Sequence, residues 1–314
     1  MNNEFIDKEL MIEQAKIIVA WDAMAAYDFA KKTGWRTPDV KALEQVVIQN
    51  EDPIAANKFA RFINGADVYA LGQVVATHGR DMSLYLFAKE VRGADVPTFE
   101  NELIKRGNID LLCKLAGHVK DVNIKKVEEI VLQSGSVENI VECATNVRGV
   151  DIAALEKALI QKHNHANPMY LYAFAEQVDG ANIPVLEQLL LEKHDPKASI
   201  MFATSIPNAC VQAHEQVVLK YGTAYDSVNF AQNVDGANIQ AHEQAVIDKG
   251  KPSDAYYLAV RVEASNKELL GRMVRDGGDQ QVIEAWSNAR PSLPNLDTLE
   301  IQQESECSNT GMGM

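Results

Sequence analysis

Apolar and polar positions along this chain follow the spacing of short helices, in a block that recurs almost from end to end. Within residues 81–107, Leu84, Phe87 and Val91 stand at i, i+3 and i+7, which is the apolar stripe of one helix face. A second stripe of the same kind lies between Asp95 and Gly107. The alternation of period two that marks β-strands is absent, so the block predicts two consecutive helices.

Glycine and short polar residues mark the ends of these helices. Gly93 ends the first helix, because glycine adopts the left-handed conformation of a helix C-terminus without steric cost. The second helix begins after a residue whose side chain can accept from free helix N–H groups, in the column Asp39, Asp67, Asp95, Asn123, Asp151, Asn182, Asn238 and Asn266. Each helix has about eleven residues, too few to be stable alone in water, so stability must come from stacking neighbouring pairs.

A Phe-Ala pair in the first helix defines the period. Its first member recurs as Phe29, Phe59, Phe87, Leu115, Cys143, Phe174, Phe202, Phe230 and Leu258. The step is 28 residues in six of the eight cases, 30 in the first and 31 after Cys143. A fixed period of this size is typical of solenoids. The sequence therefore predicts an all-α fold, an α-solenoid of about nine 28-residue helix-turn-helix repeats.

The same pattern divides the chain into four segments. Residues 1–24 are predicted to form an N-terminal capping helix, and residues 25–280 the repeat array, with a three-residue insertion within 161–168. Residues 281–298 form a degenerate terminal repeat, in which Trp286 holds the Phe position while Pro291 and Pro294 prevent a second helix in register. Residues 299–314 have no periodicity and are predicted to be a disordered tail.

The consensus FAxxVxGADxxxLExxVIxxG resembles the short α-solenoids, such as HEAT-like and leucine-rich-variant arrays, over residues 8–290. It is also similar to tandem-repeat proteins of unassigned role in bacteria and large phages. The resemblance implies a helical scaffold and transfers no catalytic residue.

Charge narrows the classes of partner. The 314-residue chain has a formal net charge of −14, and residues 151–314 carry 12 Lys and Arg against 22 Asp and Glu. Nucleic-acid phosphates require a basic surface, so no direct nucleic-acid binding is expected. A basic protein partner, mimicry of nucleic acid, or solubility alone would each account for the acidity.

The context is predicted to be soluble and cytoplasmic, or the host cytoplasm if the chain is phage-encoded. The N-terminus lacks the basic region and apolar run of a secretory signal. No stretch reaches the roughly 18 apolar residues of a membrane span. The four cysteines, Cys113, Cys143, Cys210 and Cys307, show no CxxC spacing and predict a reduced chain.

Sequence signatures of catalysis are missing. GxSxG, GxxxxGK[ST], HExxH and a strand-linked GxGxxG do not occur, so we predict a non-enzyme with no catalytic residues and no cofactor. His163 and His194 occupy equivalent places in consecutive repeats and are too far apart to share a metal ion, with His165 between them. His214 and His242 replace a second-helix leucine and are predicted to pack at the core edge. No metal site is expected.

The most regular polar feature is a glutamate column on the second helix, at Glu44, Glu100, Glu128, Glu156, Glu187, Glu215 and Glu243. An amide-rich column beside it includes Gln188, Gln216 and Gln244. Second helices commonly line the concave side of α-solenoids, where these columns would meet a partner. The alternative is structural: the glutamates lie near helix N-termini, which favour negative charge, and could accept hydrogen bonds from the next repeat.

A second variable column precedes the inter-helix glycine. It is basic at Arg92, Lys120 and Arg148 and acidic at Asp179, Asp235 and Glu263. Variation at a fixed position of a repeat is where binding specificity resides in many arrays, although a charged loop edge can also be a solvated edge. Both columns are candidate partner-binding residues.

These features predict a non-catalytic interaction scaffold that binds a protein or peptide partner through one solenoid face. The alternative is an acidic nucleic-acid mimic, or a phage-type counter-defence inhibitor, that occupies a basic site on a host protein. Added salt should weaken the binding of a mimic steeply, whereas it should weaken binding through a mixed apolar interface much less.

Overall fold

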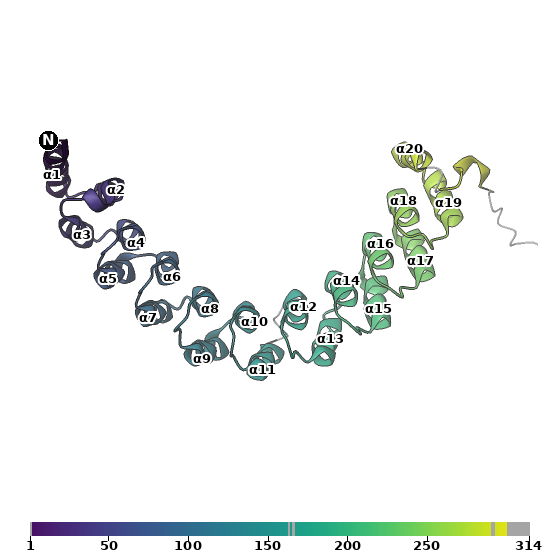
Figure 1. Ribbon diagram of the computed structural model, residues 1–314. Helices are drawn as coiled ribbons and strands as arrows, with labels where there is room; N and C mark the ends of the chain where they lie inside the picture. Colours follow the sequence, from purple (N-terminus) through teal and green to yellow (C-terminus); the bar gives the residue numbers. More distant parts are fainter. Residues whose placement is uncertain (1, 163, 165–166, 290–292, 300–314) are drawn as a thin grey trace, which may run out of the picture. The chain divides into compact units, whose positions relative to one another are not determined.

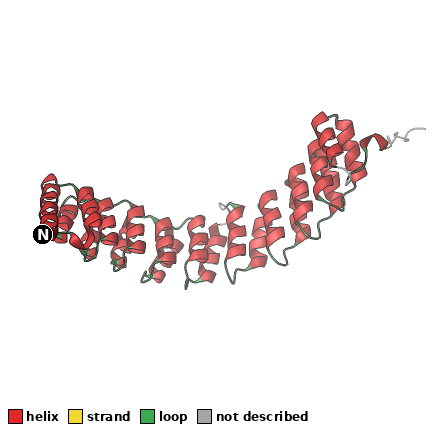
Figure 2. Cartoon of the chain, turned by 45° about the horizontal axis from the view of Figure 1, so that its top comes forward, coloured by secondary structure: helices red, strands yellow, loops and turns green. Residues whose placement is uncertain are grey.

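The computed structural model describes residues 2–162, 164, 167–289 and 293–299. Figure 2 shows helices joined by short loops throughout this part of the chain, which contains no strand. The predicted all-α solenoid is confirmed. His163, His165, Pro291, Cys307 and the tail from residue 300 lie outside the described residues.

Two kinds of helix alternate after the N-terminal helix α1 (Asn2–Ala20). The first helices of the repeats are α2 (Ala23–Thr33), α4 (Pro53–Phe62), α6 (Asp81–Glu90), α8 (Ile109–His118), α10 (Val137–Asn146), α12 (Pro168–Gln177), α14 (Pro196–Ser205), α16 (Ala224–Asn233), α18 (Pro252–Arg261) and α20 (Gln280–Asn288). The second helices are α3 (Val40–Gln49), α5 (Val68–His78), α7 (Val96–Arg106), α9 (Ile124–Ser134), α11 (Ile152–Lys162), α13 (Ile183–Leu191), α15 (Val211–Tyr221), α17 (Ile239–Lys249) and α19 (Lys267–Gly277). Short 3-10 helices occupy Gly34–Arg36 (η1) and Leu296–Thr298 (η3).

The chain forms two compact units, with the division near the predicted insertion. Unit 1 comprises residues 1–165 and 177–181, and unit 2 comprises residues 166–176 and 182–314. Each unit is a two-layer stack, with a row of first helices on a row of second helices (Figure 1).

Within each unit the first helices lie on the inner side of the bend and the second helices on the outer side (Figure 1). Two first helices of neighbouring repeats are accordingly in closer contact with each other than two second helices are. In unit 1, for example, α8 and α10 are in closer contact than α9 and α11. The expectation that the second helices line a concave surface is therefore wrong within each unit. The physical reason is that the small and apolar side chains of the first helices allow closer packing.

The core consists of one layer of aromatic and aliphatic residues per repeat. The Phe of the Phe-Ala pair is fully buried at Phe59, Phe87, Phe174, Phe202 and Phe230. The Phe87 ring lies 5.1 Å from the ring of Phe99 on the second helix of the same repeat. These side chains join the two helices of a repeat, as the apolar stripes predict.

At each end of the array, residues outside the regular repeats take the place of a neighbouring repeat. In α1, the buried Gln14 accepts from the Asp39 N–H at 3.1 Å and donates to the Asp39 carbonyl at 2.7 Å. At the other end Trp286 and Leu299 pack over Gly271, and Trp286 donates to the Pro294 carbonyl at 2.8 Å. Leu299 is buried and therefore does not begin the disordered tail that the sequence predicts from this position.

Candidate functional site

The glutamate column connects consecutive repeats. The carboxylate accepts a hydrogen bond from the backbone N–H that lies 23 residues further on, at the residue that begins the next second helix. The distance is 2.9 Å from Glu100 to Asn123 and 2.7 Å from Glu128 to Asp151 in unit 1. In unit 2 it is 2.6 Å both from Glu187 to Cys210 and from Glu215 to Asn238. The pairs Glu44–Asp67 and Glu243–Asn266 form the same bond.

This contact completes the N-terminus of the second helix that follows the glutamate. The capping side chain accepts from the N–H three residues later, as Asn123 does from Lys126 and Asn238 from Ala241. Its own N–H points out of the helix, and the glutamate of the preceding repeat accepts from it. In a capping box both partners belong to one helix; here the carboxylate comes from the neighbouring repeat. The bond therefore fixes the register of one repeat on the next.

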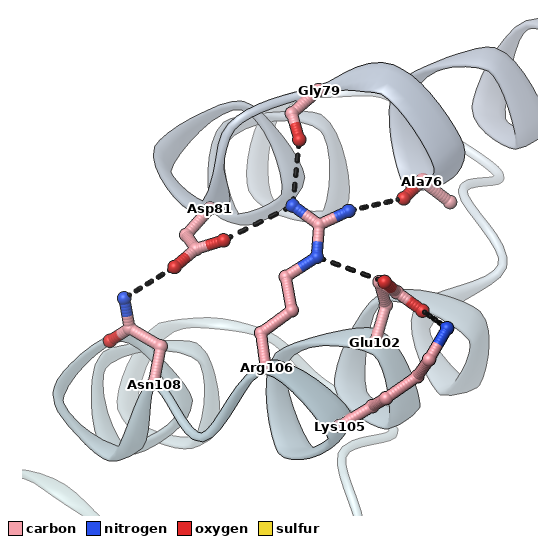
Figure 3. Close-up of polar contacts among 7 residues, drawn as sticks. All are labelled: Ala76, Gly79, Asp81, Glu102, Lys105, Arg106 and Asn108. Atoms are coloured by element: carbon pink, nitrogen blue, oxygen red, sulfur yellow. Dashed lines mark hydrogen bonds and ion pairs between the residues drawn. The ribbon is translucent and has the colours of Figure 1, made fainter.

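A matching contact joins the other ends of the second helices. Arg106, at the end of α7, donates to the carbonyls of Ala76 and Gly79 at the end of α5, both at 2.7 Å (Figure 3). The same guanidinium lies 3.1 Å from Asp81 and 2.9 Å from Glu102. A cation at a helix C-terminus satisfies free carbonyls and interacts favourably with the helix dipole.

The carboxylates of this cluster are held ionised. The hydrogen bond from Asn108, at 2.8 Å, and then that from Arg106 lower the pKa of Asp81. The hydrogen bond from Arg106 lowers the pKa of Glu102. Two lysines make contacts equivalent to that of Arg106. Lys162 donates to the Gly135 carbonyl and Lys249 donates to the Leu219 carbonyl, each at 2.5 Å. This contact of a basic side chain with the preceding second helix was not predicted, although the sequence has a basic residue before the terminal glycine.

The structure separates the candidate partner-binding glutamates by exposure. Glu100, Glu215 and Glu243 are buried, whereas Glu128, Glu156 and Glu187 are half-buried. A partner could reach the buried carboxylates only by breaking the bond to the next helix. The inter-repeat role that the sequence left open therefore accounts for the regularity of the column.

The amide column is exposed. Gln188, Gln216 and Gln244 are all exposed in unit 2. Gln244 donates to Asp248 at 2.7 Å, and Gln188 lies 3.5 Å from Glu192, one helical turn further on. These side chains are accessible from solvent and make no hydrogen bond between repeats in the described part of the chain.

The basic column lies on one edge of unit 1. Arg92, Lys120 and Arg148 occupy the same place in three consecutive inter-helix turns, and all three are exposed. The next residue has a positive φ in each turn, at Gly93, Asp121 and Gly149, so the three turns share one conformation. None of the three cations has an ion-pair partner among the described residues, whereas Arg61 and Arg106 are paired.

The thiols at the predicted core positions are buried. Cys113 and Cys143 have no exposed surface, and Cys210 is exposed. The contact with Cys143, together with burial, raises the pKa of Cys113 well above its usual range. Cys113 therefore stays protonated at neutral pH and is not an activated nucleophile.

Three further features bear on the kind of site. The described residues contain no group of three or more His, Cys, Asp or Glu side chains placed to hold a metal ion. No described helix combines the length and apolarity that crossing a membrane requires. Comparison with family models, with curated proteins and with solved structures gives no match.

Removing the charge of two inter-repeat glutamates should destabilise unit 2. In Glu215→Gln/Glu243→Gln, each bond to a helix N–H changes from charge-assisted to neutral, a loss of roughly 1 kcal/mol per site. Urea denaturation would measure the change. The control is Asp235→Asn/Glu263→Gln, which removes two exposed charges from the same unit and should change stability by less than about 0.5 kcal/mol. Equal stability of the two double variants would contradict the inter-repeat role.

Proposed function

We propose that this protein is a non-catalytic scaffold that binds a protein or peptide partner along an exposed face of the solenoid. The observation that carries the proposal is that positions between repeats and exposed positions have different roles. Positions that point between repeats are engaged with the fold, as Glu100 is with Asn123. Exposed positions differ from repeat to repeat while the backbone beneath them stays the same. The side chains of such a surface can recognise a particular partner while the scaffold stays the same.

Two exposed columns are the candidate contact residues. The exposed cations Arg92, Lys120 and Arg148 favour an acidic partner segment at the turn edge of unit 1. The amides of Gln188, Gln216 and Gln244 both donate and accept, so they favour polar partner groups on unit 2.

The second candidate function is the acidic mimic, and it rests on the other part of the same turn column. Asp235 and Glu263 are exposed in unit 2 and have no ion-pair partner in the described part of the chain. A basic site on a DNA- or RNA-handling protein would be attracted to these carboxylates.

Affinity capture with matched variants tests the proposal. The full chain would be compared with Arg92→Ser/Lys120→Ser/Arg148→Ser and with Gln188→Ala/Gln216→Ala/Gln244→Ala in nuclease-treated extract of the native cell. We expect the melting temperature of each triple variant to stay within about 3 °C of the parent, because exposed substitutions change stability little. At least one triple variant should lose a protein that the parent captures.

Two outcomes would decide against the scaffold. Either no protein is enriched over an inert control of equal charge, or both triple variants capture the same proteins as the parent. Capture of basic nucleic-acid-handling proteins that added salt releases would favour the mimic instead.

A further inference from the structure

A small hollow lies between the first two repeats of unit 1, where the inter-helix loop is two residues longer than in the regular repeats. This longer loop contains η1, and Gly34 there has a φ of +57°. The hollow has a volume of about 210 Å³ and opens between the end of α2 and the end of α4. Its lining combines the polar residues Lys31 and Asn64 with the apolar residues Val40, Phe62 and Ile63.

Phe62 is an apolar residue at a position that is otherwise polar. The residues in the same place of the other eight repeats are Lys32, Glu90, His118, Asn146, Gln177, Ser205, Asn233 and Arg261. The fold therefore does not require an aromatic ring here. The ring is nevertheless only half covered, with 49% of Phe62 exposed. A large apolar side chain that remains exposed beside a hollow is typical of a contact residue.

The surroundings of Phe62 are positively charged, in contrast to the chain as a whole. Helices α2 and α4 carry Lys31, Lys32, Lys58 and Arg61 against one carboxylate, Asp28. The Lys31 amine lies 4.8 Å from the centre of the Phe62 ring, and the Arg61 guanidinium lies 4.9 Å from it. Arg61 also pairs with Glu90, whereas Lys31 and Lys58 have no carboxylate partner among the described residues. The hollow is thus an apolar recess with an excess of cations.

We propose that this hollow anchors an acidic peptide segment of the partner, with one aliphatic or aromatic side chain in the recess and flanking carboxylates on Lys31 and Lys58. The inference rests on the proposed scaffold function and gives that function a partner chemistry and a place. The volume is below the roughly 300–1,000 Å³ of small-molecule sites, but it accommodates a single side chain of the kind that anchors interfaces.

Charge complementarity selects the acidic peptide among the possible occupants. A single-stranded nucleic acid is also an anion, but it binds through bases stacked on aromatic faces. The Phe62 ring already lies close to two cations, so a base would have to displace them. The acidity of the whole chain would also repel an extended polyanion more strongly than a short segment.

A random 12-residue peptide display library panned on the full chain tests this assignment. We expect enriched peptides to carry two or more Asp or Glu residues beside one large apolar residue. The most enriched peptide, synthesised with a fluorophore, should bind Phe62→Asn and Lys31→Gln at least tenfold more weakly than the parent. Asparagine is native at this position in two other repeats, at Asn146 and Asn233, so Phe62→Asn should fold normally, and its melting temperature checks this.

The control is Lys125→Gln, which removes one exposed cation from α9 of the same unit and should bind the peptide with unchanged affinity. Loss of affinity in that variant but not in Phe62→Asn would overturn the hollow and leave the scaffold function intact. Enriched peptides without acidic residues, or the absence of any enriched peptide, would overturn the hollow as well; the scaffold would then be judged by the capture experiment alone. Displacement of the peptide by a 12-residue oligothymidylate would favour nucleic acid and contradict the assignment.

Discussion

Phe87→Ala should lower the free energy of unfolding by about 3–5 kcal/mol, which is the usual effect of deleting a fully buried aromatic side chain. The ring has no exposed surface and lies against two other helices. It belongs to α6, lies against Phe99 on α7, and approaches Gly72 on α5, where a Cβ would come within 3.3 Å of the ring. Its removal would open a cavity at the junction of two repeats.

Met82→Ala is the matched control for Phe87→Ala. Met82 lies on the same helix but is 51% exposed, so its truncation should cost less than about 1 kcal/mol. Urea denaturation gives the two values. Hydrogen exchange would show whether the loss is confined to α5–α8, as nearest-neighbour coupling in a repeat array predicts. A loss below about 1 kcal/mol for Phe87→Ala would mean that this ring does not join the repeats.

The sequence was sufficient to predict the helices, because the signals that define them are local. Apolar spacing, capping residues and terminal glycines act within one helix, and each repeat restates them. Phe87 and Gly107 therefore have the roles in the structure that their neighbours in sequence indicate. Asp95 precedes α7 as predicted, but its side chain accepts from the Thr98 hydroxyl at 2.7 Å and makes no capping bond to a helix N–H. Which layer faces inward was not predictable in this way, because it depends on contacts between repeats rather than within one.

The inter-repeat contacts needed the three-dimensional structure. A glutamate near a helix N-terminus reads as a local preference for negative charge, yet the Glu100 carboxylate binds an N–H 23 residues further on. Gly72, which together with Gly271 interrupts the glutamate column, is also explained by its neighbours. The residue opposite it in the next repeat is Phe99 rather than the usual leucine, and a Cβ on Gly72 would come within 3.5 Å of that ring. A large residue thus compensates for a small one across two repeats.

The candidate site was partly visible in the sequence. Arg92, Lys120 and Arg148 stood out because one position changes charge along the array, and the structure adds that they are exposed and unpaired within the described residues. The hollow beside Phe62 was not predicted, although aligning the repeats by column shows an aromatic residue where the others are polar. The recess itself depends on the fold of the longer loop, which has no counterpart in the regular repeats.

Unit 2 should lose stability when the pH falls from 7.5 to 5.5, because two buried histidines resist protonation. His214 and His242 have no exposed surface, and their rings lie 5.1 Å from Phe202 and 5.0 Å from Phe230. Burial lowers the pKa of both histidines below the ordinary value of 6.5 and outweighs the opposite effect of the facing carboxylates. The facing carboxylates are those of Glu187, 3.1 Å from His214, and of Glu215, 3.3 Å from His242.

The sign of the effect follows from proton uptake. Unfolded chains bind protons as the pH falls through about 6.5, whereas the folded chain does so only at lower pH, so acid favours unfolding. One pH unit corresponds to about 1.4 kcal/mol per histidine. The loss between pH 6.5 and 5.5 is therefore at most about 1.4 kcal/mol for each histidine, or about 2.8 kcal/mol for the two together.

Urea denaturation of the parent at pH 7.5 and pH 5.5 would measure this loss, and His214→Leu/His242→Leu is the matched variant. Leucine occupies the same column at Leu43, Leu71, Leu155, Leu186 and Leu270 and is buried there, so the variant should fold normally. It should also retain the bonds from Glu187 and Glu215 to the backbone of the next repeat, because those bonds do not involve the imidazoles. We expect most of the pH dependence between 7.5 and 5.5 to disappear. An equal loss in both proteins would place the acid-sensitive group elsewhere, and a parent more stable at pH 5.5 would mean that the carboxylates, rather than burial, control these two histidines.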